Sequence, residues 1–250
     1  MLQRVYPTVP SAAHMGAADV SEKPLSVNRQ PSKCSVPGVE EAALSLLQLA
    51  PHSKVLDLGC YHGSASRVLA STGYKVWSCD LEAHPDAQAL PNFMRVDANR
   101  PLPYDANFFD GVLCTEVIEH LENPTLLIRE CARILSPGGV LVVSTPAISN
   151  LAGRLCYLAT GEFPTFGPRH FHEWGHLSPV SRIWLILTAK KHGLLSEAVS
   201  TEAGPLGWKR RLASSLLRLP LGLLIRQHDD LNFRSTVIIR FRKTCLPNSA

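Results

Sequence analysis

The chain has 250 residues, of which 45% are hydrophobic and 18% are charged, a composition typical of a folded globular protein and not of a disordered or fibrous one. This length accommodates one α/β domain with a small appendage rather than two full domains. The formal net charge of +4 at pH 7 is too small to indicate a nucleic-acid partner, and none is favoured.

Residues 1–36 mix Pro, Ser and Ala with isolated charges and lack periodicity, which predicts a mobile N-terminal arm. The folded domain is expected to span 37–250. It begins with apolar residues at helical spacing, which follow Gly38 and stop at Pro51. Beyond this helix, short apolar runs alternate with helical patterns.

This alternation predicts βαβ units and a mainly parallel sheet. Pro137, Gly138 and Gly139 should turn the chain from a helix into the fifth strand. The strand-like segments are 54–59, 75–80, 93–97, 108–116, 139–146, 194–201 and 232–243, and the helical segments after the first are 64–72, 124–136 and 179–193.

Two further stretches differ from this pattern. Residues 147–178 are rich in Gly, Pro and aromatic side chains, and residues 205–228 combine basic residues with a leucine-rich face. The second composition is typical of a helix on an anionic membrane, which makes 208–226 a candidate for peripheral membrane contact, although core packing or a dimer contact is favoured. The sequence does not fix the oligomeric state.

The cysteines and the apolar runs indicate the cellular compartment of the protein. The 7 cysteines are scattered without a CxxC pair, as is typical of reduced thiols in the cytoplasm. The chain does not open with the charged and apolar segments of a secretory signal, and no apolar run reaches the roughly 18 residues that a membrane span needs. We therefore expect a cytoplasmic location.

Acidic residues follow three successive strands, at Asp57, Asp80 and Asp97. Ligands of a parallel sheet bind beyond the carboxyl ends of its strands, so these carboxylates should gather at one edge. Gly59 and Gly63 allow a tight turn and close backbone approach beside the first acid. Such a corner would repel a pyrophosphate and would suit a cationic nucleoside with neutral ribose hydroxyls. The alternative for each acid is a structural role as a helix or turn cap.

A dinucleotide cofactor also uses a strand, a glycine turn and an acid. Its G-x-G-x-x-G fingerprint, however, requires glycine where this chain has Tyr61 and Ser64. A nucleotide-cofactor oxidoreductase is therefore the disfavoured alternative.

The segments VLDLGCYHG, WSCD, RVDA, FDGVLCTEVIEHLENP and ILSPGGVLVVSTP resemble, in this order, the class I S-adenosylmethionine-dependent methyltransferases. The resemblance covers about residues 39–145. It implies a Rossmann-like three-layer α/β sandwich with a seven-stranded, mainly parallel sheet whose last strand is antiparallel. It also implies S-adenosyl-L-methionine as cofactor and O-methylation of a small-molecule or glycan acceptor. Because the family commonly has Gly at the position of Tyr61, a catalytically inactive methyltransferase-like binding module is the alternative.

The resemblance also implies roles for single residues. The acid and glycines of the first turn would frame the methionine end of the cofactor, Asp80 would accept the ribose hydroxyls, and Asp97 with the Ala98 backbone would meet the adenine. Thr115 and Glu116 would lie near the sulfonium. The full predicted cofactor set is Asp57, Gly59, Cys60, Tyr61, Gly63, Asp80, Leu81, Asp97, Ala98, Thr115 and Glu116.

The string TEVIEHL spaces Glu116, Glu119 and His120 so that a helical turn would bring them together. We predict His120 and Glu119 as catalytic residues, with His120 as a base or polar wall for the acceptor. The string resembles the metal motif of ubiquinone-biosynthesis O-methyltransferases and of small-RNA 2′-O-methyltransferases, and it is also common in methyltransferases without metal. A divalent metal is therefore kept as an alternative that is not favoured. A purely structural start of a helix is the other alternative.

In the resembled family a substrate-covering insertion follows the fifth strand, here about 147–178. The segment PRHFHEWGHLSP within it carries His170, His172, Glu173 and His176. These side chains are expected to line a polar acceptor pocket, with completion of a metal site or no role as alternatives.

Overall fold

The computed structural model describes residues 38–202 and 236–244. The predicted arm at 1–36 and the basic segment at 205–228, with its membrane-contact candidate 208–226, lie outside the described residues. No described helix is both long enough and apolar enough to span a membrane. The cysteines within the described residues are all free thiols.

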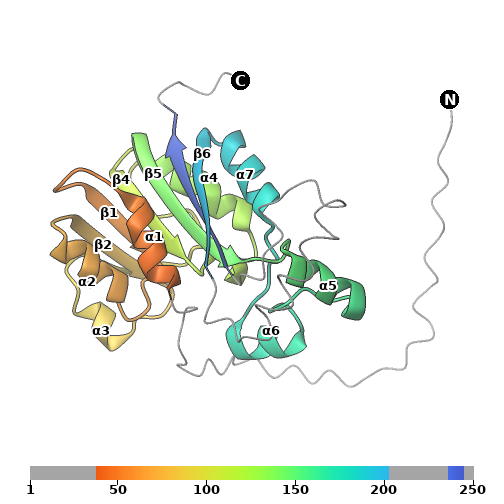
Figure 1. Ribbon diagram of the computed structural model, residues 1–250. Coiled ribbons are helices and arrows are strands. Elements are labelled where there is room, and N and C mark those ends of the chain that lie inside the picture. Colours follow the sequence, from red (N-terminus) through yellow and green to blue (C-terminus); the bar gives the residue numbers. More distant parts are fainter. Residues whose placement is uncertain (1–37, 203–235, 245–250) are drawn as a thin grey trace, which may run out of the picture.

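The described strands form one seven-stranded sheet in the order β3-β2-β1-β4-β5-β7-β6 (Figure 1). The strands from β3 to β5 pair in parallel, whereas β7 runs antiparallel between β5 and β6. The predicted sheet, with an antiparallel last strand, is confirmed. The strands are β1 (Lys54–Leu58), β2 (Lys75–Asp80), β3 (Phe93–Arg95), β4 (Phe109–Thr115), β5 (Leu135–Pro146), β6 (Leu194–Glu202) and β7 (Thr236–Lys243).

Helices cover both faces of this sheet, which gives the predicted three layers (Figure 1). Successive residues of a strand point to opposite faces. Accordingly, Val55 belongs to the apolar cluster shared with α1 (Val39–Leu47) and α2 (Ser64–Ser71). Its neighbour Leu56 belongs to the larger cluster shared with α4 (Pro124–Ile134) and α7 (Arg182–Lys191).

Side-chain caps fix where the two long helices of the larger layer begin. Asn123 accepts a hydrogen bond from the Leu126 N–H at 3.1 Å at the start of α4. Ser181 accepts one from the Trp184 N–H at 3.3 Å at the start of α7. Both contacts satisfy a backbone donor that a helix leaves unpaired in its first turn.

The fifth strand begins earlier than predicted. β5 starts at Leu135, directly after α4, and Leu135 pairs with Phe109 before the ladder resumes between Val140 and Gly111. The residues 136–139 bulge out between these pairs. The expected turn is therefore an irregularity within the strand, and Gly138 adopts the left-handed φ of 78° that it requires.

The segment 147–178 contains two helices, α5 (Leu151–Thr160) and α6 (Pro168–Trp174), that the sequence patterns did not predict. Both lie beyond the carboxyl end of β5, apart from the helices that cover the faces (Figure 1). Asn150 caps α5 by accepting the Gly153 N–H at 2.7 Å. The apolar side chains of α5 remain largely outside the core, with Leu158 82% exposed.

Arg240 of β7 joins the last strand to the first helix. Its guanidinium donates to the Leu46 carbonyl and, at 2.9 Å, to the Leu47 carbonyl, at the C-terminus of α1. It also pairs with Glu197 of β6 at 2.8 Å. The carbonyl end of a helix favours a cation. The charge of the buried Arg240 is therefore balanced by the end of α1 on one side and by the Glu197 carboxylate on the other.

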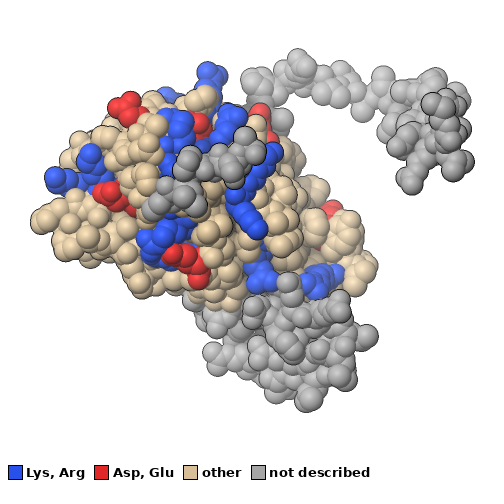
Figure 2. Space-filling model, turned by 90° about the horizontal axis from the view of Figure 1, so that it is seen from above, with Lys and Arg blue, Asp and Glu red and all other residues tan. Residues whose placement is uncertain are grey.

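The amino ends of the parallel strands form the opposite end of the molecule. Figure 2 views this end and shows Lys and Arg side chains spread over it with Asp and Glu among them. Lys54 begins β1, and its Nζ lies 4.3 Å from the ring centre of Phe108. The predicted site residues gather at the other end, beyond the carboxyl ends of the strands.

Candidate active site

Asp57 is buried in β1 and is held by two serines. Its carboxylate accepts a hydrogen bond from the Ser66 hydroxyl at 2.5 Å, and Ser66 in turn lies 2.7 Å from the Ser78 hydroxyl. Burial raises the pKa of Asp57 to about 6, and the Ser66 hydrogen bond opposes part of this rise. Neither serine was predicted as a site residue; Ser66 comes from α2 and Ser78 from β2.

The turn after β1 is compact because two of its residues are glycines. Gly59 has a φ of 79°, and its N–H shares the Cys79 carbonyl with that of Cys60, at 2.8 and 3.1 Å. A Cβ added to Gly59 would lie 2.2 Å from Cγ2 of Val117, and one added to Gly63 would lie 2.4 Å from a methyl of Leu90. The turn therefore packs directly against the segment that follows β4.

Asp80, at the end of β2, is oriented by two backbone donors. One carboxylate oxygen accepts the Tyr61 N–H at 2.9 Å and the other accepts the Glu82 N–H at 3.0 Å. Each carboxylate oxygen has a second acceptor position, so Asp80 can still bind two hydroxyls. Tyr61 has a left-handed φ of 47°, and its ring packs edge-on against His62, with ring centres 3.9 Å apart.

The remaining predicted contacts of the cofactor follow β2 and β3. Asp97 accepts the Asn99 N–H at 2.9 Å and lies 3.3 Å from Nε of Arg100. Ala98 packs against the larger core, and Leu81 is 45% exposed. The Asn99 side chain, which was not predicted as a site residue, accepts the Glu122 N–H at 2.8 Å and connects this turn to the loop before α4.

Glu116 follows Thr115, the last residue of β4, and adopts a left-handed φ of 53°. Its N–H donates to the Ser144 hydroxyl at 3.0 Å, and that hydroxyl donates back to the Glu116 carboxylate at 2.8 Å. Burial raises the pKa of Glu116 to about 7. Ser144, on β5, is a second partner that sequence reasoning did not find.

Glu119 lies in the 3₁₀ turn η1 (Ile118–His120) and is fully buried. Neither of its carboxylate oxygens accepts a hydrogen bond of normal distance and angle from the described residues, although the Thr145 hydroxyl is near enough to oppose part of the rise in its pKa. Burial and the nearby charge of Glu116 raise the pKa of Glu119 well above its usual value. A buried carboxylate without partners must either keep its proton or bind a cation.

The segment 147–178 returns to this turn and brings His176 with it. The Glu119 carbonyl accepts the N–H groups of Leu177 and Ser178 at 2.8 and 2.9 Å. The rings of His120 and His176 then lie 5.0 Å apart, and ligand atoms of Glu119, His120 and His176 all lie within 4.8 Å of one another.

Both imidazoles of this cluster have a defined tautomer. Nδ1 of His120 lies 3.3 Å from the Gly175 carbonyl, and Nδ1 of His176 lies 2.8 Å from the Thr165 carbonyl. A carbonyl only accepts, so Nδ1 carries the hydrogen and Nε2 carries the lone pair in each neutral ring. Burial lowers the pKa of His176, which favours the neutral form.

Of the four candidates in PRHFHEWGHLSP, His176 alone joins this cluster. His172 and Glu173 are exposed, and Glu173 pairs with Arg169 at 3.0 Å. His170 packs against Trp174, with ring centres 5.1 Å apart.

The sequence matches known proteins over part of its length. Residues 56–143 match the family model described as a methyltransferase domain. A ubiquinone biosynthesis O-methyltransferase of Xanthomonas oryzae pv. oryzae is 30% identical over 133 residues, which cover 49% of this chain and 55% of that protein. One from Colwellia psychrerythraea is 27% identical over 173 residues, 65% of this chain and 70% of that protein. The chain spans about half the length of the first of these curated relatives.

Solved structures show the same fold. An S-adenosylmethionine dependent methyltransferase from Mesorhizobium loti superposes with a TM-score of 0.56 and 19% identity, covering 82% of this chain and 99% of that one. The YcgJ protein from Bacillus subtilis gives a TM-score of 0.58 at 13% identity, over 82% and 98%.

Proposed function

Because residues 56–143 belong to the class I S-adenosylmethionine-dependent methyltransferases, we propose that this protein transfers the methyl group of S-adenosylmethionine to an oxygen of a small molecule. The observation that carries the proposal is the cluster of the buried Glu119 with the partly buried His120 and His176. This cluster follows Val117, which packs against Gly59 of the turn suited to a cationic nucleoside. By their names, the curated relatives are O-methyltransferases of ubiquinone biosynthesis. That chemistry supports a hydroxyl of a small quinol-type molecule as the acceptor.

The cofactor would bind across the carboxyl ends of the first strands. Asp80, already fixed by two backbone donors, accepts the ribose hydroxyls. The turn at Gly59 lets the methionine end of the cofactor approach the backbone. The negative charge of the Asp57 carboxylate attracts the ammonium group of the cofactor. Asp97 with Ala98 binds the adenine, and Glu116 lies toward the sulfonium.

The reaction breaks the S–CH₃ bond and forms an O–CH₃ bond, so the acceptor hydroxyl must lose its proton. His120 takes that proton at Nε2, because Nδ1 is held by the Gly175 carbonyl. Most of the rate enhancement comes from holding the oxygen about 3–3.5 Å from the methyl carbon. The segment 147–178, anchored at the Glu119 carbonyl, excludes water from this step.

The orphaned carboxylate of Glu119 also fits a divalent metal ion. Glu119, His120 and His176 would hold it, a donor set of one carboxylate and two imidazoles that suits zinc-like ions. Such an ion would polarise the acceptor hydroxyl and lower its pKa. The two modes of activation differ in their response to a chelator, which abolishes turnover only where an ion is required.

The test is methyl transfer from S-adenosylmethionine carrying a radiolabelled methyl group. Purified protein is incubated with a panel of catechols and quinols, and separately with glycans, and the products are separated by chromatography. Label in a phenolic methyl ether supports the proposal, and label in glycan alone moves the acceptor to that class. Tight cofactor binding without transfer to any hydroxyl would instead identify a binding module. Asp80→Ala is the control, and at subsaturating cofactor it should lower transfer to each acceptor alike.

A further inference from the structure

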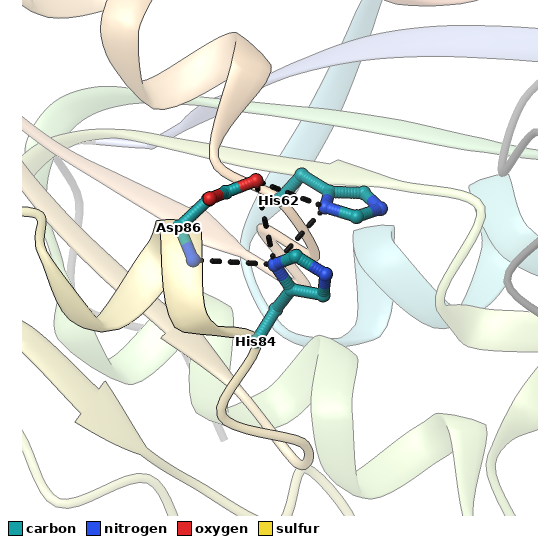
Figure 3. Close-up of side chains that lie close together, drawn as sticks. All are labelled: His62, His84 and Asp86. Carbon is teal, nitrogen blue, oxygen red and sulfur yellow. Dashed lines mark hydrogen bonds and ion pairs between the residues drawn. The ribbon is translucent and has the colours of Figure 1, made fainter.

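A second cluster of imidazole and carboxylate groups lies outside the residues used so far. It comprises His62, His84 and Asp86 (Figure 3). Nδ1 of His62 lies 3.0 Å from Nδ1 of His84, and one Asp86 carboxylate oxygen lies 3.5 and 3.6 Å from these two nitrogens. Figure 3 shows both rings turned so that these atoms face one another. The three atoms form a triangle with two nearly equal long edges and one shorter edge.

Two edges of this triangle match one face of a tetrahedral metal site, and the third, between the two nitrogens, is shorter at 3.0 Å. Ligand atoms bound to zinc at 2.0–2.2 Å in a tetrahedron are about 3.3–3.6 Å apart. Two imidazole lone pairs cannot face each other at this distance without a proton or a cation between them. A single shared proton satisfies the pair in the absence of metal, and a divalent ion can replace it.

We propose that His62, His84 and Asp86 bind a divalent transition-metal ion of the zinc type, with solvent in the fourth position. Two imidazoles and one carboxylate are the ligand classes that such ions prefer. The partial exposure of all three side chains leaves an entry path and an open coordination position. Binding exchanges one existing contact, the 3.2 Å hydrogen bond from the Asp86 N–H to His84 Nδ1, for a coordinate bond.

The ion would connect two loops that are distant in sequence. His62 lies in the turn between β1 and α2, one residue after Tyr61, whose N–H orients Asp80. His84 and Asp86 lie at the start of the short helix α3 (Pro85–Gln88), which follows Asp80. The ion therefore holds together the two loops that flank the proposed ribose site, and it should tighten cofactor binding by about fivefold or more.

The test is a Co²⁺ titration followed by visible absorption, with Zn²⁺ competition, in the full chain without cofactor. The protein carries Glu119→Gln, so that the cluster around His120 does not dominate the signal. One ion per chain with tetrahedral absorption is expected. His84→Asn should weaken binding by on the order of 100-fold or more, because it removes a ligand yet keeps a residue that caps α3.

His62→Gln should have the same effect as His84→Asn, which guards against a folding defect specific to either variant. The matched control is His52→Asn, an exposed histidine at a left-handed position before β1. The proposal is overturned if the Glu119→Gln protein binds no ion, or if the ion remains bound in both ligand variants. Since the readout needs no methyl acceptor, it is independent of the proposed activity.

Discussion

The carboxylates on the cofactor side and on the acceptor side of the sheet edge differ in their hydrogen bonding. On the cofactor side, Asp57 and Asp80 have oxygens that accept hydrogen bonds from serine or backbone donors. On the acceptor side, Glu119 is buried, and neither of its oxygens accepts a hydrogen bond within the part of the chain that the structure describes. Carboxylates that already accept hydrogen bonds are held in place and suit a recognition role, whereas one without such bonds retains the capacity to react with a proton or an ion.

The contrast is tested most strongly by His120→Ala. If the acceptor side is the reactive side, turnover should fall by about 100- to 10,000-fold, the typical contribution of a positioned base. Cofactor affinity should stay within about threefold, because the substituted ring lies outside the cofactor corner. Turnover and cofactor binding are measured separately, with the exposed His172→Ala as control. Equal losses in turnover and in cofactor affinity would show that His120 does not act on the acceptor side alone.

The rigidity of the cofactor side is tested by Gly59→Ala. The new Cβ would lie 2.2 Å from Val117, at a φ of 79° that costs a non-glycine residue about 1–2 kcal/mol, and overpacking adds about 1–3 kcal/mol. Gly73→Ala is the matched control, since Gly73 also has a positive φ but nothing within 4 Å of its Cβ. Urea unfolding should therefore show a larger loss for Gly59→Ala. Identical losses would mean that the turn does not pack tightly.

Asp80→Ala isolates recognition from chemistry. Loss of charge-assisted hydrogen bonds should weaken S-adenosylmethionine binding by about 1.5–3 kcal/mol, roughly 10- to 100-fold. Turnover at saturating cofactor should change less. Calorimetry gives the affinity, and Arg100→Ala, which removes an exposed partner of Asp97, is a control expected to change it little. Unchanged affinity in Asp80→Ala would remove this residue from the ribose site.

Glu119→Gln should change the pH dependence of stability. The pKa of Glu119 is higher in the folded state than in the unfolded chain, where it is near 4.5. Protonated Glu119 therefore contributes its full stabilisation to the fold below pH 4.5, and this contribution is lost as the pH rises. The free energy of unfolding should fall by up to about 1.4 kcal/mol per pH unit from this group, until the folded pKa is passed. The variant should lack this component in urea unfolding from pH 5 to 8. Parallel curves would show that the carboxylate is not protonated in the fold.

The sequence predicted the sheet and an acid at or just beyond the end of each of three successive strands, because short apolar runs between helical patterns, and the acids that follow them, are local signals. It did not predict the partners of those acids. Ser144 meets Glu116 across 28 residues, and His176 joins His120 only because the chain returns to the Glu119 carbonyl. The helices of 147–178 were missed for another reason: α5 leaves Leu158 and its neighbours exposed, so burial imposes no clear helical period.

Because Arg240 is synthesised late, the contacts of α1 with β7 can form only near the end of translation. The carbonyls that end α1 are made nearly two hundred residues before the arginine that caps them. A nascent chain that stops short of β7 thus exposes the inner edge of β5, with a row of unpaired backbone groups, and leaves the first helix without its cation. Ribosome-bound intermediates should accordingly stay open to proteases until the final strand emerges from the exit tunnel.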